Sequence, residues 1–382
     1  MIEFDERLRT VRGIAVEAAA DLRSRALSVD TDPHDMERHF DSPSFRLMRT
    51  IGTPVEYRDA DGASELVLDP RNHCLENAVS TLELARGDAG TILACPGPGL
   101  AGVVVDMLGS EAQRERFHRA LADGRTWSFF AMTEPARGND ATAMETRLDA
   151  DGQGGRLLNG HKRYIGNAAR GGVGVVFART GRSPLSIRAV LVEPPLPGWR
   201  GTPLEMVGLR GAFLSELTFD GVPVAADALL GEHLPVTRRG IWGAVKTFNA
   251  MRVQIAALAV GTTLAMVDYV TEHRTGKPES YGAERVLARA EAARQLVYEA
   301  AARIDRDPER GYLSSAAKLA ANRLAVRTAG WASAALGPAG LIEHPLLEKW
   351  TRDVHAFEYM EGTANIQRLH VEKGYRTGDA DA

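Results

Sequence analysis

This 382-residue sequence has very few cysteines and no long apolar run. Cys74 and Cys95 are its only cysteines, too few for a disulfide framework or a cysteine-based metal centre. No stretch of about 18 consecutive apolar residues is present, which argues against a membrane span. The acidic opening, residues 1–6, is unlike a secretory signal. The sequence therefore predicts a cytoplasmic globular protein.

A surplus of basic charge is also missing. Lys and Arg total 46 and Asp and Glu total 50, so the net charge is −4 and no overall basic field attracts nucleic acid. Lysine is scarce, with six residues among those 46. A hydrophobic content of 44% and a charged content of 25% are ordinary for a globular chain of two or three domains. These values exclude a disordered or collagen-like protein.

The spacing of apolar residues divides the chain into helical and β-rich parts. Near the N-terminus apolar residues recur at helical spacing, and Ser110 followed by Gln113 is the capping-box pattern of a helix start. In the middle, short apolar runs such as 174–178 and 189–192 are separated by Gly, Pro, Asn and Asp, which is typical of a β-barrel or sandwich. Long Ala-rich helical patterns return afterwards and favour a bundle. We predict an α+β protein with an N-terminal helical domain over 1–125, a middle β domain over 126–232 and a C-terminal helical bundle over 233–382.

Several common catalytic motifs are absent from the sequence. It contains no Walker A, HExxH or GxSxG motif and no spaced Cys/His cluster, so we expect no metal site of these kinds. The glycines at 171, 172 and 174 do not form a strand–GxGxxG–helix unit, which argues against a Rossmann nicotinamide site.

The stretch 130–140 (Phe-Ala-Met-Thr-Glu-Pro-Ala-Arg-Gly-Asn-Asp) is a polar loop that leaves a predicted strand. Thr133 offers a hydroxyl group, and the backbone amide of Gly138 can approach a ligand closely. The stretch resembles the Thr-Glu-Pro-x-x-Gly-Ser-Asp loop of the acyl-CoA dehydrogenase family, with Asn139 in place of the serine.

Further segments resemble the same family in the same order along the chain, over roughly 83–368. Residues 159–167 resemble its Asn-Gly-x-Lys-x-Trp-Ile-Thr-Asn strand, and residues 248–252 resemble its Phe-Asp-x-x-Arg helix start. Residues 361–368 read Glu-Gly-Thr-Ala-Asn-Ile-Gln-Arg, similar to its closing Glu-Gly-Thr-x-x-Ile-Gln-Arg. The resemblance implies a helical domain, a β domain and a C-terminal four-helix bundle.

This resemblance implies FAD-dependent α,β-dehydrogenation of an acyl thioester. The weakly acidic α proton needs a carboxylate base, and the hydride from the β carbon needs a flavin. Glu361 stands at the Glu of Glu-Gly-Thr and is the candidate base. Some members carry the base just before the central-helix arginine, but Met251 stands there and cannot take a proton. Glu358 is the local alternative, outside the matching motif.

The resemblance also assigns residues to the cofactor. Tyr164 takes the place of a Trp on the flavin face, and Gly166 replaces the Thr or Ser that reaches flavin N5. Arg274, in a loop one position shorter than usual, is expected to meet the pyrophosphate of FAD held mainly by a neighbouring subunit. The full expected cofactor set is Met132, Thr133, Gly138, Asn139, Tyr164, Gly166, Arg274, Gly337, Gly340, Thr363 and Gln367.

Three residues are expected near the substrate. Asn249 replaces the usual Asp beside the pantetheine arm, Arg252 follows it, and Cys95 lies near the segment that covers the acyl chain. The carrier remains open between coenzyme A and an acyl carrier protein. An electron-transfer flavoprotein or another acceptor is the expected redox partner. Because Arg274 serves a neighbour, we expect a homo-oligomer, either a dimer or a tetramer.

Two alternative functions use the same fold. The first is a flavin-dependent oxidase or monooxygenase, which the missing hydroxyl at Gly166 leaves open and the retained Glu361 disfavours. The second is a flavin-less adaptor, which the many matching flavin-facing positions disfavour.

Overall fold

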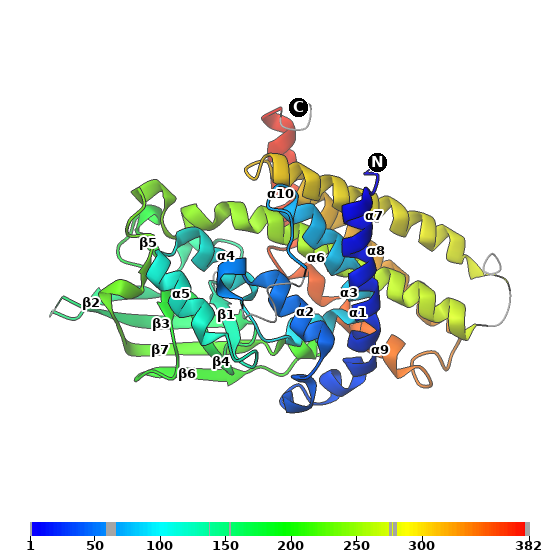
Figure 1. Ribbon diagram of the computed structural model, residues 1–382, viewed down its shortest axis with the longest axis horizontal. Coiled ribbons are helices and arrows are strands. Elements are labelled where there is room, and N and C mark those ends of the chain that lie inside the picture. Colours follow the sequence, from blue (N-terminus) through cyan, green and yellow to red (C-terminus); the bar gives the residue numbers. More distant parts are fainter. Residues whose placement is uncertain are drawn as a thin grey trace.

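The computed structural model describes residues 2–58, 66–136, 138–152, 154–274, 277 and 281–378. Its first part is helical (Figure 1). The capping box predicted at Ser110 is present, because its Oγ accepts a hydrogen bond from Gln113 N and its own N–H donates to Gln113 Oε1. The helices of this part are α1 (Glu6–Thr31), α2 (Pro43–Gly52), α3 (His73–Ala94), α4 (Gly99–Leu108) and α5 (Glu111–Ala120).

The middle of the chain forms one eight-stranded sheet. The strand order is β6-β7-β3-β2-β4-β5-β8, and β1 pairs with β4 in parallel. The β1–β4 pairing is close because Gly174 lies directly under the ring of Phe129, where a Cβ atom would come within 2.5 Å of it. The strands are β1 (Trp127–Ala131), β2 (Arg147–Ala150), β3 (Arg156–Ile165), β4 (Gly171–Arg179), β5 (Ile187–Val192), β6 (Trp199–Pro203), β7 (Ser215–Val224) and β8 (Leu229–Leu230).

Long helices make up the last part, so the predicted α+β class and the order of helices, sheet and helices are confirmed (Figure 1). The central helix α6 packs against α3, α7 and α8. Gly261 permits the close approach to α3, because a Cβ there would lie 2.3 Å from the Leu82 carbonyl oxygen. The helices are α6 (Gly240–His273), α7 (Ala283–Arg306), α8 (Tyr312–Leu336), α9 (Pro345–Asp353) and α10 (Ala364–Arg376).

One segment of α6 deserves comparison with a membrane span. Thr247–His273 is long and apolar enough to cross a membrane by length and composition alone. Of its most apolar stretch, 83% is buried inside the protein, against the neighbouring helices. Its position is therefore that of a core helix.

A buried charge cluster joins the three parts of the fold; we call Lys349, Asp88 and Asp353 the α3–α9 cluster. Lys349 Nζ lies 2.6 Å from both Asp88 Oδ2 and Asp353 Oδ2, and all three side chains are at most 1% exposed. Trp350 Nε1 donates to Asp88, and the backbone N–H of Leu209, in the middle part, donates to Asp353 Oδ1 at 2.6 Å. Each carboxylate thus meets several donors, which is the condition for tolerating a charge in the interior.

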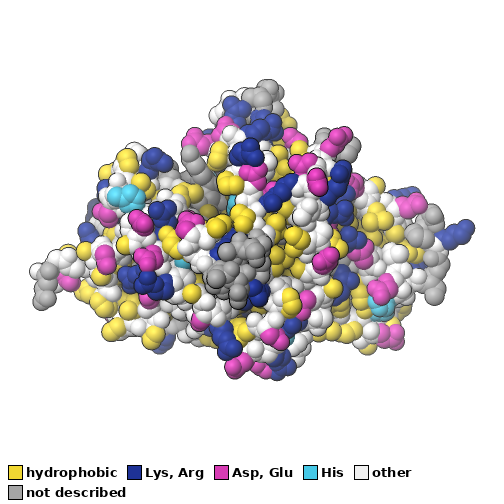
Figure 2. All heavy atoms as spheres, viewed as in Figure 1, with side chains coloured by type: hydrophobic (Ala, Val, Ile, Leu, Met, Phe, Trp, Pro, Cys, Tyr) yellow, Lys and Arg dark blue, Asp and Glu magenta, His cyan; other side chains and the backbone are white. Residues whose placement is uncertain are grey.

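The visible surface carries no broad field of one sign. Figure 2 shows Lys and Arg side chains interspersed with Asp and Glu over the whole of this face. That distribution agrees with the small net charge of −4.

Candidate functional site

Glu361 lies in a tight turn between α9 and α10 with an unusual backbone. Its φ is 50° and that of Gly362 is 93°, so both residues occupy the left-handed region. This conformation costs a non-glycine residue about 1–2 kcal/mol. Gln367 Nε2 donates to the carbonyl oxygens of both residues at 2.9 Å, and Lys318 Nζ donates to that of Gly362 at 2.8 Å. Buried side chains of α10 and α8 therefore hold the strained turn in place.

The surroundings of Glu361 suit a proton acceptor. Burial raises the pKa of its carboxyl group above the ordinary value, while the positive charges of Arg252 and Lys318 act in the opposite direction. Burial also lowers the pKa of Arg252 to about 10, which still leaves its guanidinium charged at neutral pH. A carboxylate whose pKa is raised towards neutrality is a better general base than an ordinary glutamate.

The alternative base, Glu358, is engaged elsewhere. Its Oε1 accepts a hydrogen bond of 2.6 Å from the backbone N–H of Ala364, in the first turn of α10. A carboxylate at a helix N-terminus is stabilised in its charged form by the free N–H groups there. The geometry therefore gives Glu358 a structural task and leaves Glu361 as the carboxyl group set among buried cations.

Asn249 orients Arg252 and ties down a neighbouring loop. Its Oδ1 accepts from Arg252 Nη1 at 2.8 Å, while its Nδ2 donates to the Pro308 carbonyl oxygen at 2.9 Å. The loop passes so close that a Cβ at Gly311 would lie 2.0 Å from Asn249 Oδ1. An amide can donate and accept at once, whereas an aspartate could only accept. The replacement of the family's usual Asp thus has a physical reason in this chain.

Some buried polar atoms on α6, α8 and α10 have no hydrogen-bond partner, as have others elsewhere in the described residues. Arg252 Nε, Gln367 Oε1, Gln254 Oε1 and Asn322 Oδ1 are buried, and none has a hydrogen-bond partner among the residues that the structure describes. Buried polar groups are almost always paired in folded proteins. Arg252 Nε and Gln367 Oε1, on residues that interact with Glu361, are therefore free to bond to a polar ligand.

The loop that follows β1 is anchored to β3 and reaches α10. Lys162 Nζ donates to the carbonyl oxygen of Met132 and to Glu134, each at 2.9 Å, and the carbonyl oxygen of Thr133 accepts from Arg163 N at 3.0 Å. Further along, Asn139 Oδ1 accepts from Thr363 Oγ1 at 3.4 Å. Two motifs more than 200 residues apart in sequence are thus brought together.

Gly138 lies in the exposed part of this loop. Nothing within 4 Å would meet a Cβ at that position, so the backbone there has open space beside it. That space suits the close approach of a ligand to the backbone.

Tyr164 and Gly166 lie at the end of β3 in a segment that packs on the end of α3. Tyr164 is 55% exposed and has a φ of 64°, and Asn167 Nδ2 donates to the carbonyl oxygen of Leu93 in α3 at 3.1 Å. A Cβ at Gly166 would make only an ordinary contact, at 3.5 Å from the Ala212 oxygen. Sterics alone do not require glycine at 166.

Cys95 follows α3 and packs into the N-terminal helices. Its Sγ lies 3.7 Å from the Phe45 carbonyl oxygen and 3.2 Å from that of Pro96. Burial raises the pKa of its thiol to about 12, so the group stays protonated and unreactive at neutral pH. The structure gives Cys95 a packing role and shows no contact between it and Glu361.

Arg274, Gly337 and Gly340 lie far from Glu361 within one chain. Arg274 Nη1 donates to the carbonyl oxygen of Ala335, next to the Gly337 turn. It ends α6 22 residues after Arg252, which is about 33 Å along a helix axis. Figure 1 shows the end of α6 remote from α10. The structure thus separates the predicted site residues into two groups.

Beside Arg274 lies a basic cavity of about 290 Å³. The Arg274 guanidinium stands 5.1 Å from the ring centroid of Tyr281, which lines the cavity. The other lining residues are Gly282, Arg285, Val286, Arg289, Leu324, Arg327, Thr328 and Trp331. Arginine guanidinium groups bind phosphate, and large aromatic rings contact planar groups. Three arginines and two aromatic rings therefore suit a ligand that carries both a phosphate and an aromatic ring.

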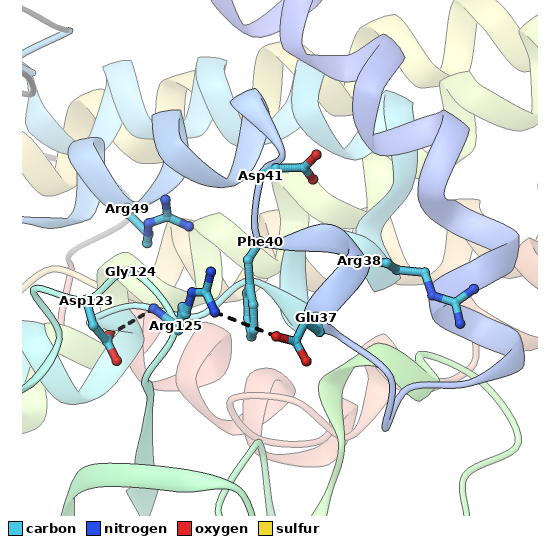
Figure 3. A pocket seen from close by; sticks show the side chains of 8 residues that line it. All are labelled: Glu37, Arg38, Phe40, Asp41, Arg49, Asp123, Gly124 and Arg125. Atoms are coloured by element: carbon cyan, nitrogen blue, oxygen red, sulfur yellow. Dashed lines mark hydrogen bonds and ion pairs between the residues drawn. The ribbon is translucent and has the colours of Figure 1, made fainter.

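A second cavity, of about 340 Å³, contains none of the predicted site residues (Figure 3). Charged residues of this cavity already have partners within the protein. Arg125 forms an ion pair with Glu37 at 3.8 Å, and Asp123 Oδ1 accepts a hydrogen bond from the backbone N–H of Arg125 at 2.9 Å. The remaining lining residues are Arg38, Phe40, Asp41, Arg49 and Gly124. We do not place the reaction there.

Among the described residues, no group of three or more His, Cys, Asp or Glu side chains is placed to hold a metal ion.

Sequence reasoning missed two residues near Glu361. Lys318 is fully buried on α8, and His370, on α10, lies 3.4 Å from Ser315 Oγ. Burial, with the charges of Arg252 and Lys373, lowers the pKa of His370 to about 4. For Lys318 a signal existed: a lysine on the apolar face of an Ala-rich helix needs a partner.

Comparison with known proteins gives consistent matches. The model of the acyl-CoA dehydrogenase middle domain matches residues 129–222, and that of the C-terminal domain matches residues 238–375. The short-chain specific acyl-CoA dehydrogenase of Megasphaera elsdenii is 27% identical over 388 residues, covering 96% of this chain and 98% of that protein. The human mitochondrial short-chain specific enzyme is 30% identical over 327 residues, covering 79% and 77%.

Solved structures agree in fold over nearly the whole length. Glutaryl-coenzyme A dehydrogenase in complex with glutaryl-CoA matches with a TM-score of 0.82 at 25% identity, over 99% of this chain and 97% of that one. The prolyl acyl carrier protein oxidase AnaB has a TM-score of 0.82 at 22% identity, over 97% and 99%. The FAD complex of PigA has a TM-score of 0.80 at 19% identity, over 99% of both chains.

Proposed function

The chain belongs to the acyl-CoA dehydrogenase family, and from that premise we propose that Glu361 is the base that removes the α proton of an acyl thioester. The chain is an oxidoreductase acting on CH–CH groups, and FAD is its cofactor. One observation carries the proposal: the partly buried Glu361 carboxyl group interacts with the charges of Arg252 and Lys318, on a turn that side chains of α8 and α10 hold by hydrogen bonds.

The residues around Glu361 fit a bound flavin. The unpartnered Gln367 Oε1 and the open space at Gly138 are places for polar and backbone contacts to the cofactor. Met132, Thr133, Asn139 and Thr363 lie in the two segments that meet there. We assign the contacts with the cofactor in this half to these residues together with Tyr164 and Gly166.

The chemistry divides between cofactor and chain. FAD, when bound, supplies the acceptor for the hydride that leaves the β carbon. A Glu361 oxygen takes the α proton and becomes a carboxylic acid, and the electron pair of the Cα–H bond forms the new double bond. Burial serves this step, because a base with a raised pKa competes better for a weakly acidic proton.

The second half of the cofactor site supports a homo-oligomer. Arg274 lies about 33 Å along α6 from Arg252 and contacts Ala335 beside the Gly337 turn, so both are too far to join the groups around Glu361 in one chain. We assign them, with the basic cavity at Tyr281 and Arg285, to the FAD of a neighbouring subunit, in a dimer or tetramer. A flavin-loaded monomer in light scattering at micromolar concentration would contradict this assignment.

The decisive experiment is anaerobic reduction of the flavin by defined thioesters. The FAD-loaded protein is mixed with a panel of acyl-CoA and acyl-carrier-protein thioesters, and products are identified by mass spectrometry. Bleaching of the flavin together with an α,β-unsaturated product supports the proposal, and the panel identifies the carrier. A protein that cannot be loaded with FAD would overturn it.

The identity of the electron acceptor distinguishes a dehydrogenase from the alternative oxidase or monooxygenase. We propose an electron-transfer flavoprotein or a similar carrier as the acceptor, so turnover should reduce an artificial acceptor with little oxygen consumed. Oxygen uptake that matches product formation would favour the oxidase or monooxygenase, consistent with the missing hydroxyl at Gly166.

A further inference from the structure

Among the side chains that the structure describes, three lysines are fully buried, and they differ in the groups that they contact. Lys162 lies 2.9 Å from a Glu134 oxygen, and Lys349 lies 2.6 Å from two aspartates. Lys318 Nζ instead donates to two carbonyl oxygens, those of Gly362 at 2.8 Å and Glu358 at 3.4 Å. The charge of Lys318 therefore lacks the direct carboxylate contact that the other two have within the described part of the chain.

The segment that Lys318 contacts is the one that carries Glu361. Residues 354–363 form turns and a short 3-10 helix, outside the regular hydrogen bonding of α9 and α10. Helix α8 supplies donors from two side chains one turn apart. Asn322 Nδ2 donates to the Phe357 oxygen at 3.0 Å, and Lys318 donates to the oxygens further along. Both residues are at most 5% exposed.

We propose that Lys318 is a positioning residue for Glu361, holding its strained turn by hydrogen bonds and favouring its charged carboxylate by a positive charge that forms no direct ion pair with the described residues. The inference rests on the proposed role of Glu361 as the base. Asn322 shares the first task but not the second, because its amide carries no charge. The two α8 side chains thus separate the mechanical effect from the electrostatic one.

The charges around Glu361 fix the sign of the expected effect. Burial raises the pKa of Glu361, and the charges of Lys318 and Arg252 act against that rise. Removing the charge of Lys318 should therefore raise the pKa of Glu361 further. Burial lowers the pKa of Lys318 itself to about 8, so its charge is present below that pH. The other ionisable groups facing this cluster are Glu358 in the turn, and His370 and Lys373 on α10.

The test compares Lys318→Met with Asn322→Leu in the full-length, FAD-loaded enzyme. The rate of flavin bleaching by a saturating thioester is measured from pH 5 to pH 8. In the plot of bleaching rate against pH, we expect the midpoint of the acid limb to lie about one pH unit higher for Lys318→Met than for wild type. A shift of this size is typical of the loss of one nearby opposite charge. Asn322→Leu should lower thermal stability and leave the acid limb in place. Equal displacement in both variants, or in neither, would overturn the proposal.

A second measurement needs no turnover. The infrared carboxyl band of Glu361, identified by its loss in Glu361→Gln, is titrated in wild type and in Lys318→Gln, whose amide can still donate a hydrogen bond. A higher midpoint in Lys318→Gln supports the electrostatic role, and an unchanged midpoint overturns it. If no thioester of the panel bleaches the flavin of the wild-type protein, the proposed function fails. The titration still tests the role of Lys318 in that case. Unfolded Lys318 variants beside a folded Asn322→Leu would indicate a purely structural lysine and overturn the proposal.

Discussion

The α3–α9 cluster and the surroundings of Glu361 are both buried and charged, but they complete their hydrogen bonds differently. In the α3–α9 cluster, the Asp88 carboxylate accepts hydrogen bonds from Lys349, from Trp350 and from the backbone N–H and hydroxyl group of Thr91. Around Glu361, the Arg252 Nε and Gln367 Oε1 atoms have no partner in the described protein. The first network is closed by the fold itself, whereas the second is left open.

The difference separates a stabilising role from a functional one. A closed buried network is favourable only while every member is present, so it fastens distant segments to one another. An open network costs stability until a ligand completes it. Changes at the two places should therefore act on different observables, and four predictions test that distinction.

The largest effect is expected for Glu361→Gln. Glutamine keeps the size of the side chain but cannot accept the α proton, so flavin bleaching should slow by about 10²–10⁴-fold while FAD binding and melting temperature stay close to wild type. Stopped-flow absorbance of the flavin measures the rate. Glu358→Gln is the control, and its rate should remain near wild type because that carboxylate faces the Ala364 N–H. If Glu358→Gln were the slower of the two, the base would be misassigned by one turn.

Lys349→Met should produce the opposite pattern. It leaves Asp88 and Asp353 buried without their cation, and such a loss costs about 3–5 kcal/mol of unfolding free energy. Urea denaturation measures it, and bleaching per folded, flavin-loaded chain should change little. Arg119→Met, which breaks an exposed ion pair with Glu115, is the control and should have a small effect. A stable Lys349→Met protein would contradict the structural role of the cluster.

Asn249→Asp tests the amide that links Arg252 to the 307–311 loop. A carboxylate cannot donate to the Pro308 oxygen, so we expect a loss of about 1–3 kcal/mol, seen as a lower melting temperature. Asn365→Asp is the same chemical change at an exposed residue that only accepts, from Arg368 Nη1 at 2.7 Å. The control should therefore melt like wild type, and an equal drop in both would mean that donation to Pro308 is unimportant.

The smallest effect concerns acid stability and His370. Its pKa is lowered to about 4 in the folded protein, so the unfolded chain takes up a proton first, and stability falls between about pH 6.5 and pH 4. His370→Gln lacks this proton uptake and should lose less stability over that range. Melting temperatures at pH 7 and pH 5 measure the difference, with the exposed His233→Gln as the control. An equal loss in wild type and His370→Gln would contradict the prediction.

Features set by neighbouring residues could be predicted from the sequence. The capping box at Ser110 needs only Gln113 three residues later, and the apolar run 189–192, predicted as part of the β domain, lies in β5. The number of strands is harder to predict where a glycine interrupts an apolar run. The runs 217–219 and 222–224 are separated by Gly221 in the sequence, yet both belong to the single strand β7.

Features set by distant residues could not be predicted in this way. Lys349 lies 261 positions from Asp88 in the sequence, and no local pattern predicts that the two residues form an ion pair. Glu361 itself was identified by resemblance, but the two cations that act on it, Arg252 and Lys318, come from two distant helices, α6 and α8. Lys318 in particular acquires a role only when α8 is seen against the turn after α9.

The backbone of Glu361 has one further consequence, for the history of this position. At a φ of 50°, beside a glycine at 93°, the residue that suits the chain best is another glycine, and a Glu361→Gly protein should hold this turn with less strain. A chain selected for heat resistance alone would therefore tend to discard the carboxylate. The role that we propose for Glu361 as the base gives a reason for keeping a carboxylate on this backbone at a cost in stability.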